Sequence, residues 1–173
     1  MEFSLPQAYL GGLLVLLSIA AVVVGRQILR VRRDEIALAR LEGETKGSDQ
    51  TAADLYELGS VQLRKRLYNQ AADTLKRALK AAAAEPSEAQ ALIENALGFA
   101  LAAQSNYSGA IRHYRSALRA KADYPVALNN LAFALEKQQK PEEAKETYAK
   151  VLALDAANRT ALKRLKRLER LAA

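Results

Sequence analysis

A residue pattern that recurs every 34 positions constrains this chain more than any other feature of its sequence. Segments 91–123 and 125–158 carry the same residues at matching positions. The matched pairs are Asn95 and Asn129, Leu97 and Leu131, Phe99 and Phe133, Ala110 and Ala144, and Tyr114 and Tyr148. A unit of this length cannot bury its apolar face alone, so neighbouring copies must stack against one another.

An earlier copy of the pattern lies in segment 53–80. Its Leu58-Gly59, Ala71 and Ala78 precede their equivalents in the next copy by five residues more than the repeat period. The five extra residues fit within 80–90, where two helices are expected to run long. In each copy a short polar turn separates two segments with helical spacing: "LYNQ" (67–70), "SNYS" (105–108) and "QKPE" (139–142). We therefore predict an all-α fold with three helical hairpins in residues 51–158.

The composition agrees with an all-helical chain and argues against catalysis. Half of the residues are hydrophobic, and Ala, Leu, Glu, Lys and Arg dominate. The sequence has no cysteine, which excludes disulfides, thiolate metal sites and a lipoprotein anchor. The single histidine, His113, falls on a predicted outer helix, without a glycine-rich phosphate loop or clustered carboxylates. We expect no enzyme activity, metal, cofactor or small-molecule substrate.

The three copies resemble the tetratricopeptide repeat, whose period is the same. The resemblance rests on small and apolar residues where the paired helices cross: Leu58-Gly59, Leu97-Gly98 and Leu131-Ala132; Ala71, Ala110 and Ala144; Leu75, Tyr114 and Tyr148; Ala78, Ala117 and Val151. It implies a right-handed superhelix of three repeats. The sequence departs from the family at the fourth position, where tryptophan is replaced by Leu55, Glu94 and Leu128.

Segment 159–173 follows the repeats and is expected to close the stack. Leucines recur there at intervals of three, at Leu162, Leu165, Leu168 and Leu171. We expect these leucines to lie on one side of a basic capping helix, with charges on the other side. An open stack needs such a cap for solubility.

The resemblance also implies a concave groove, lined by the second, fifth, ninth, twelfth and thirteenth positions of each first helix. The predicted groove residues stand at the fifth and ninth of these positions: Tyr56, Ser60, Asn95, Phe99, Asn129, Phe133, Lys163 and Arg167. An asparagine amide there can pair with the backbone of an extended peptide, and a phenylalanine can cover an apolar side chain. The alternative is that the asparagines cap or bridge neighbouring helices and that the phenylalanines belong to the core.

Some members of this family hold the C-terminal carboxylate of a chaperone with basic residues and asparagines. The matching positions here are Tyr56, Ser60, Ala96, Val126 and Asn130, and none of them is basic. The resemblance therefore does not extend to that ligand. Asn130 lies about 100° round the helix from Asn129, so we expect it to bond locally.

An uncharged apolar stretch, residues 8–25, lies near the start of the chain. As a helix it is about 27 Å long, close to the thickness of a bilayer core. We predict an uncleaved transmembrane helix over residues 8–30, after a tail of residues 1–7. A buried core helix would need a comparable apolar partner. A cleaved signal peptide needs basic residues before the apolar stretch, where only Glu2 is charged.

The residues around this stretch predict its orientation. The basic residues nearest to it follow it, at Arg26, Arg30, Arg32 and Arg33. The positive-inside rule then places the N-terminus in the lumen and the repeats on the cytoplasmic or stromal side. Small residues at Gly11, Ser18 and Gly25 share one helix face, where another membrane helix can dock. Residues 31–50 are expected to form a juxtamembrane helix and a linker.

The order of anchor, linker, repeats and basic cap is similar to that of the thylakoid tetratricopeptide proteins of cyanobacteria and plastids. The segments that carry this resemblance are "YELGSVQLRKRLYNQA" (56–71), "NALGFALAAQSNYSGAIRHYRSAL" (95–118) and "YPVALNNLAFALEKQ" (124–138). That family assists assembly or stability of photosystem I. The resemblance therefore implies a scaffold in the thylakoid membrane that contacts photosystem I subunits or an assembly intermediate.

Two other functions are weighed against this one. A bacterial membrane scaffold could recruit a soluble partner for envelope biogenesis or secretion. Basic clusters, such as 64–66 and the capping helix, could meet nucleic acid, lipid headgroups or an acidic protein surface. We expect no nucleic acid as partner, because the anchor confines the chain to the membrane surface and no groove-reading motif is present.

Overall fold

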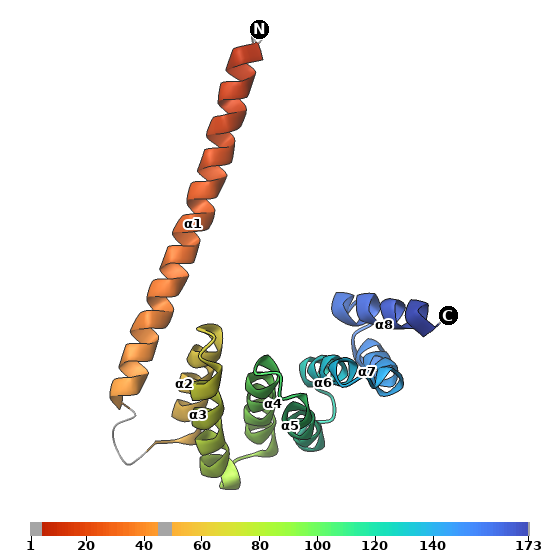
Figure 1. Cartoon of the computed structure of the whole chain (residues 1–173). Helices are drawn as coiled ribbons and strands as arrows, with labels where there is room; N and C mark the ends of the chain where they lie inside the picture. The colour runs from red at the N-terminus through yellow and green to blue at the C-terminus, as the bar shows by residue number, and fades with distance from the viewer. Residues whose placement is uncertain (1–4, 45–49, 173) are drawn as a thin grey trace. The chain divides into compact units, whose positions relative to one another are not determined.

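The computed structural model describes residues 5–44 and 50–172, and every regular element in these ranges is helical (Figure 1). The chain divides into two units, Met1–Arg40 and Leu41–Ala173. The expected N-terminal tail falls partly on residues 1–4, and the middle of the expected linker falls on residues 45–49. Both of these segments lie outside the described residues. The predicted all-α class is confirmed.

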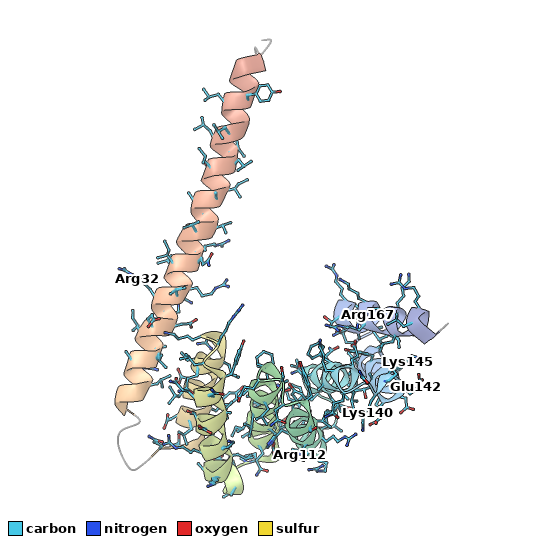
Figure 2. All side chains as sticks on the ribbon, in the orientation of Figure 1. Arg32, Arg112, Lys140, Glu142, Lys145 and Arg167 are labelled. Atoms are coloured by element: carbon cyan, nitrogen blue, oxygen red, sulfur yellow. The ribbon has the colours of Figure 1, made fainter. Side chains whose placement is uncertain are left out.

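Helix α1, Leu5–Glu44, is a single helix of 40 residues. It contains one stretch, Tyr9–Leu41, that is long and apolar enough to cross a membrane by length and composition. Side chains project from the helix along its length (Figure 2). From residue 9 onward they are largely exposed, and Leu14, Val23 and Ile28 are each more than half exposed. The helix continues through Gly11 and Gly12, whose surroundings are open.

Three helical hairpins follow, and several of their helices begin with a recognisable start signal. The first pairs α2 (Ala52–Arg64) with α3 (Tyr68–Ala81), and the second pairs α4 (Ser87–Ala103) with α5 (Tyr107–Ala120). The third pairs α6 (Pro125–Lys137) with α7 (Pro141–Leu154), and α8 (Arg159–Ala172) ends the series. Thr51 and Asp54 form a capping box before α2, and prolines open α6 and α7.

The five extra residues of the first copy extend the connection between the first two hairpins. A short 3₁₀ turn, η1 (Ala82–Ala84), follows α3, and α4 has 17 residues where α2 and α6 have 13. The side chain of Gln90 donates to the carbonyls of Ala82 and Glu85, at 3.1 and 3.0 Å, and so fixes this turn to α4. The insertion therefore lengthens α4 and leaves the stacking order unchanged.

Close approach of the paired helices depends on the small residues that the repeat pattern marks. A Cβ added at Gly59 would lie 2.7 Å from Cγ of Leu75, and one added at Gly98 would lie 2.7 Å from Cε1 of Tyr114. Both contacts are closer than van der Waals packing allows, so a larger residue would force the neighbouring side chain to move. Glycine at these two sites therefore lets the paired helices approach without displacing Leu75 or Tyr114.

In residues 50–172, the buried apolar residues of the stack form two clusters. The buried apolar residues of the first and second hairpins form one cluster, which includes Leu55, Leu75 and Leu97. Those of the second and third hairpins form another, which includes Tyr114 and Tyr148, and Ala161 and Leu168 of α8 join it. The final helix thus covers the last hairpin, as a cap does.

The face by which α8 packs differs from the sequence expectation. Ala161 and Leu168 are buried and Leu165 is partly buried, whereas Leu162 is 49% exposed and Leu171 is 75% exposed. The prediction that all four leucines share the packed side was wrong. A step of three residues is shorter than one helical turn, so a stripe with this spacing drifts round the helix, and Ala161 fills the place assigned to Leu162.

Candidate protein-binding groove

The first helices of the hairpins form one layer of the stack. Helix α2 contacts α4, α4 contacts α6, and α8 packs against α7 at the end of the series. Side chains at equivalent positions of α2, α4 and α6 therefore follow one another along the same face. This face carries the predicted groove residues, from Tyr56 on α2 to Arg167 on α8.

The fifth-position asparagines bridge adjacent repeats. Nδ2 of Asn95 donates to the hydroxyl of Tyr124 at 3.3 Å, and Nδ2 of Asn129 donates to Oδ1 of Asn158 at 3.3 Å. Tyr124 and Asn158 each lie just before the next helix, at equivalent places one repeat period apart. Asn158 also accepts from the backbone N–H of Ala161 at 3.1 Å, so it caps α8. These contacts agree with the alternative stated in the sequence analysis, in which the asparagines bridge neighbouring helices.

A further amide extends the bridge between α4 and α6. Nδ2 of Asn130 donates to Oδ1 of Asn95 at 3.0 Å. Asn130 thus bonds across to the previous repeat, where the sequence analysis expected a local partner. Burial raises the pKa of the Tyr124 phenol, which lies at the end of this chain of bonds. Oδ1 of Asn129 is buried and has no partner among the described residues. These amides therefore bond α4 to α6, and each of these helices to the residue that precedes the next first helix or α8.

Exposed apolar side chains lie on the same layer. Leu92 is 41% exposed, Phe99 44% and Val126 54%. Leu92 and Val126 stand at the second position of α4 and α6, and Phe99 stands at the ninth position of α4. Exposed apolar surface at repeated positions of one face is typical of a protein-binding site.

Phe133, the ninth-position residue of α6, lies in a different environment from Phe99. Its ring is partly buried and is flanked by two cations. Nζ of Lys137 lies 5.6 Å from the ring centroid, and Cζ of Arg164 lies 4.8 Å from it. These distances are within the range of cation–π contacts. Phe133 therefore joins α6 to α8 and offers less apolar surface than Phe99.

The N-terminal end of this layer has an apolar hollow of about 260 Å³. Tyr56 and Ala53 of α2 line it together with Leu92 and Ile93 of α4. Tyr56 is half-buried there, and Ser60 is half-buried one turn further along α2. The hollow can accept an apolar side chain from a partner.

The C-terminal end has a basic hollow of about 420 Å³ on α8, lined by Arg159, Thr160, Lys163, Arg164 and Arg167. Both predicted residues of the cap, Lys163 and Arg167, lie in it and are exposed. Figure 2 labels Arg167 on α8. The layer thus changes from apolar to basic along its length.

Glu136 fixes two of these arginines. Its side chain is only 5% exposed, and its carboxylate accepts from Arg167 at 2.8 Å, from Arg164 at 3.3 Å and from the Tyr148 hydroxyl at 2.6 Å. Burial raises the pKa of the Tyr148 phenol, and the hydrogen bond to Glu136 adds to this effect. The contacts of Glu136 connect α6, α7 and α8.

The arrangement offers binding surfaces and no catalytic constellation among the described residues. Nδ1 of His113 lies 2.6 Å from the Glu94 carboxylate, and both side chains are largely covered. The part of the chain that the structure describes contains no group of three or more His, Cys, Asp and Glu side chains that could hold a metal ion. The groove can bind a polypeptide through apolar contacts, hydrogen bonds and charge.

Sequence reasoning did not select four residues that shape this groove: Leu92, Val126, Glu136 and Arg164. Leu92 and Val126 stand at the second position, which was expected to face the groove, so the repeat pattern could have identified them. Glu136 and Arg164 carry no such signal, since their contact depends on how α8 is placed on α6.

The residues predicted to lie in or beside a membrane are on α1. Ser18 donates its hydroxyl to the carbonyl of Leu14 at 2.8 Å, and Gly11 and Gly25 have open space around them. The side chains of Arg26, Arg30, Arg32 and Arg33 are exposed, and Figure 2 labels Arg32. Arg26, Arg30 and Arg33 fall on one face of the helix, at intervals of four and three residues.

Comparison with known proteins agrees with the repeat fold. Residues 101–168 match the family model described as "Tetratricopeptide repeat". Among solved structures, the first tetratricopeptide domain of Spaghetti (RPAP3), bound to the HSP90 peptide SRMEEVD, superposes with a TM-score of 0.66 at 25% identity. The superposition covers 72% of this chain and 95% of that one.

Two curated relatives match almost the whole chain. The protein ycf37 of Guillardia theta is 30% identical over 165 residues, which cover 95% of this chain and 93% of that protein. The chloroplastic tetratricopeptide repeat domain-containing protein PYG7 of Arabidopsis thaliana is 30% identical over 160 residues. This second match covers 92% of the present chain and 53% of the Arabidopsis protein. The similarity includes the region of α1 as well as the repeats.

Proposed function

Because the chain belongs to the ycf37 family of tetratricopeptide-repeat proteins, we propose that it is a membrane-anchored, non-catalytic scaffold that assists assembly or stability of photosystem I. In this proposal the groove binds a polypeptide segment of a photosystem I subunit or assembly intermediate. Helix α1 holds the groove at the thylakoid membrane, and the repeats lie on the cytoplasmic or stromal side.

The observation that carries the binding role is the row of exposed apolar side chains on the first helices. Leu92, Phe99 and Val126 are each more than 40% exposed, although they lie on helices whose other apolar residues are largely buried. Exposed apolar side chains are stabilised when a partner covers them, and this gain is the main source of affinity in protein interfaces. The adjacent hollow beside Tyr56 provides a place for an anchoring side chain.

The anchor is supported by the length and exposure of α1. Its apolar stretch has side chains such as Leu16 and Val22 more than half exposed, which is costly in water and favourable in lipid. Exposed arginines follow this stretch at residues 26, 30, 32 and 33, where they can meet lipid headgroups. Confinement to the membrane plane raises the effective concentration of membrane partners, so a weak groove contact is sufficient.

The photosystem assignment rests on the family resemblance of the sequence. The name of the Arabidopsis relative places that protein in the chloroplast, which is consistent with a thylakoid role. The small residues Gly11, Ser18 and Gly25 provide a face on which a helix of a membrane complex can pack closely. We propose this face as a second contact with the same complex.

Affinity purification of the tagged full chain from gently solubilised thylakoids tests the proposal. Recovery of incomplete photosystem I cores is expected with the wild type. The double variant Phe99→Ala/Val126→Ala should weaken this binding by roughly 1–4 kcal/mol in total, because it removes apolar contact surface in the groove. The variant should stay folded, since both side chains are exposed.

The matched control is Leu154→Ala/Leu162→Ala. These leucines are 45% and 49% exposed, and neither stands at a groove position. The control should retain wild-type recovery. Equal recovery by all three proteins would mean that another surface binds the partner. Recovery of envelope-biogenesis or secretion components, without photosystem I subunits, would reject the photosystem assignment and favour the general membrane scaffold.

A further inference from the structure

Two arginines of the basic hollow on α8, Arg164 and Arg167, are held in place by other side chains of the stack. Glu136 bonds Arg164 and Arg167 from a nearly buried position, and Arg164 also lies over the Phe133 ring. A guanidinium fixed in this way loses little further side-chain freedom when it binds a ligand. The hollow therefore has a defined shape.

The charge of this hollow is only partly balanced. One carboxylate, that of Glu136, bonds two of its arginines. Within the described part of the chain, the side chains of Arg159 and Lys163 form no hydrogen bond or ion pair, although both line the hollow. Helix α8 has six basic residues and one acidic residue, Glu169. Such an excess of positive charge attracts a carboxylate-bearing ligand.

The position of the hollow indicates what kind of ligand it serves. Lys163 and Arg167 continue the fifth and ninth positions of α6, and Phe133 connects the two helices. A segment that covers Phe99 and Val126 can extend along the same face to α8. A lipid surface fits less well, because Ala161 and Leu168 of α8 are buried in the stack and the exposed leucines, Leu162 and Leu171, do not line the hollow.

We propose that the hollow formed by Arg159, Thr160, Lys163, Arg164 and Arg167 binds the acidic part of a polypeptide segment whose apolar part covers Phe99 and Val126. The site recognises carboxylates through the last helix, away from the chaperone-carboxylate positions Tyr56, Ser60, Ala96, Val126 and Asn130, none of which is basic. This inference deepens the proposed function and rests on peptide binding in the groove.

The test uses a random peptide library, so it assumes no ligand sequence. The full chain is reconstituted in nanodiscs of neutral lipid, and a displayed library of random twelve-residue peptides is selected on it. Wild-type protein is expected to enrich peptides that combine apolar residues with a run of Asp or Glu. Binding of the strongest peptide is then measured at low and high salt, where high salt should weaken it.

The diagnostic variant is Arg159→Glu/Lys163→Glu. Neither side chain bonds another described residue, and glutamate at the start of α8 favours the helix, so the fold should be retained. Binding of the selected peptide should fall by roughly tenfold or more. The control Arg112→Glu/Lys166→Glu makes the same change of net charge outside the hollow and should bind within about twofold of the wild type.

The possible results distinguish the acidic-segment site on α8 from peptide binding in the groove as a whole. Enrichment of apolar peptides without acidic residues would overturn the acidic site and leave peptide binding in the groove intact. Failure to enrich any peptide would count against both. Equal loss in the two charge variants would also overturn the proposed site. If anionic phosphatidylglycerol in the nanodisc abolishes peptide binding in the wild type alone, lipid is the occupant of the hollow and the inference fails.

Discussion

At the residue scale, Glu136 is the side chain on which the placement of the last helix depends. Its carboxylate joins Tyr148 of α7 to Arg164 and Arg167 of α8. A charge held at 5% exposure requires partners, because a buried carboxylate without them is strongly disfavoured. Glu136 is therefore a structural residue that also shapes the adjacent groove.

Substitution Glu136→Gln should destabilise the fold by about 1–3 kcal/mol, since it keeps the shape and removes the charge that pairs with two arginines. The value lies below that of a fully buried pair because Arg164 and Arg167 are partly solvated, at 32% and 56% exposure. Urea unfolding and hydrogen exchange of α8 measure the effect. The control Glu142→Gln removes the charge of a 77% exposed carboxylate that pairs with Lys145, and it should change stability by less than about 0.5 kcal/mol. Equal effects would contradict the role of Glu136.

Two buried tyrosines make stability depend on pH in the alkaline range. Burial raises the pKa of Tyr114 and of Tyr148 above the ordinary value near 10. The neutral phenols are therefore favoured in the fold, so their contribution is complete below about pH 10 and is lost as pH rises through the folded-state pKa. Each tyrosine should lower the free energy of unfolding by about 1.4 kcal/mol per pH unit in that window. Denaturant unfolding at pH 9, 10 and 11 should show a smaller slope in Tyr114→Phe. An unchanged slope would exclude this tyrosine.

At the element scale, the three first helices end in the same way. Arg66, Ser105 and Gln139 occupy equivalent positions and have φ of 61°, 62° and 59°. In each case the next residue donates to a carbonyl five residues back, with N···O distances of 2.9, 2.9 and 3.0 Å. This is the Schellman motif, whose left-handed residue is usually glycine. At each of these three turns the backbone enters the left-handed region without glycine.

Substitution Gln139→Gly should raise stability by about 0.5–1 kcal/mol, because glycine adopts a positive φ without the steric cost that a Cβ imposes. Gln139 is exposed, so little packing is lost. Thermal unfolding followed by circular dichroism measures the gain. The control Lys150→Gly lies at an exposed position inside α7 and should lower stability by about 1 kcal/mol. A loss at both positions would show that the turn is not strained.

The sequence predicts the hairpins well because their signals are local. Helical spacing, the polar turns and the small residues at Gly59 and Gly98 all lie within one repeat. Contacts between repeats are less predictable, since they depend on how far one helix is rotated against the next. The bond from Asn95 to Tyr124 and the exposure of Leu162 both depend on this rotation, so the pattern within one repeat does not determine them.

At the scale of the whole molecule, the chain joins two units with different requirements. The apolar stretch of helix α1 has exposed side chains on all sides, and no other described element belongs to its unit. The repeats bury their apolar residues in a stack and leave a groove that runs from apolar to basic. In the proposed function, lipid covers the apolar stretch of the first unit, and a polypeptide partner covers the exposed apolar side chains of the second.

The last prediction concerns the side of the membrane on which the repeats lie. Arg26, Arg30, Arg32 and Arg33 follow the apolar stretch of α1, and the positive-inside rule places them, with the repeats, on the cytoplasmic or stromal side. Trypsin added to right-side-out thylakoid vesicles, which present the cytoplasmic or stromal side to the medium, should digest the repeats. Inside-out thylakoid vesicles, which present the lumenal side, should protect them until detergent is added. Protection in the first preparation and digestion in the second would reverse the orientation, and the groove would then face the lumen, out of reach of any stromal partner.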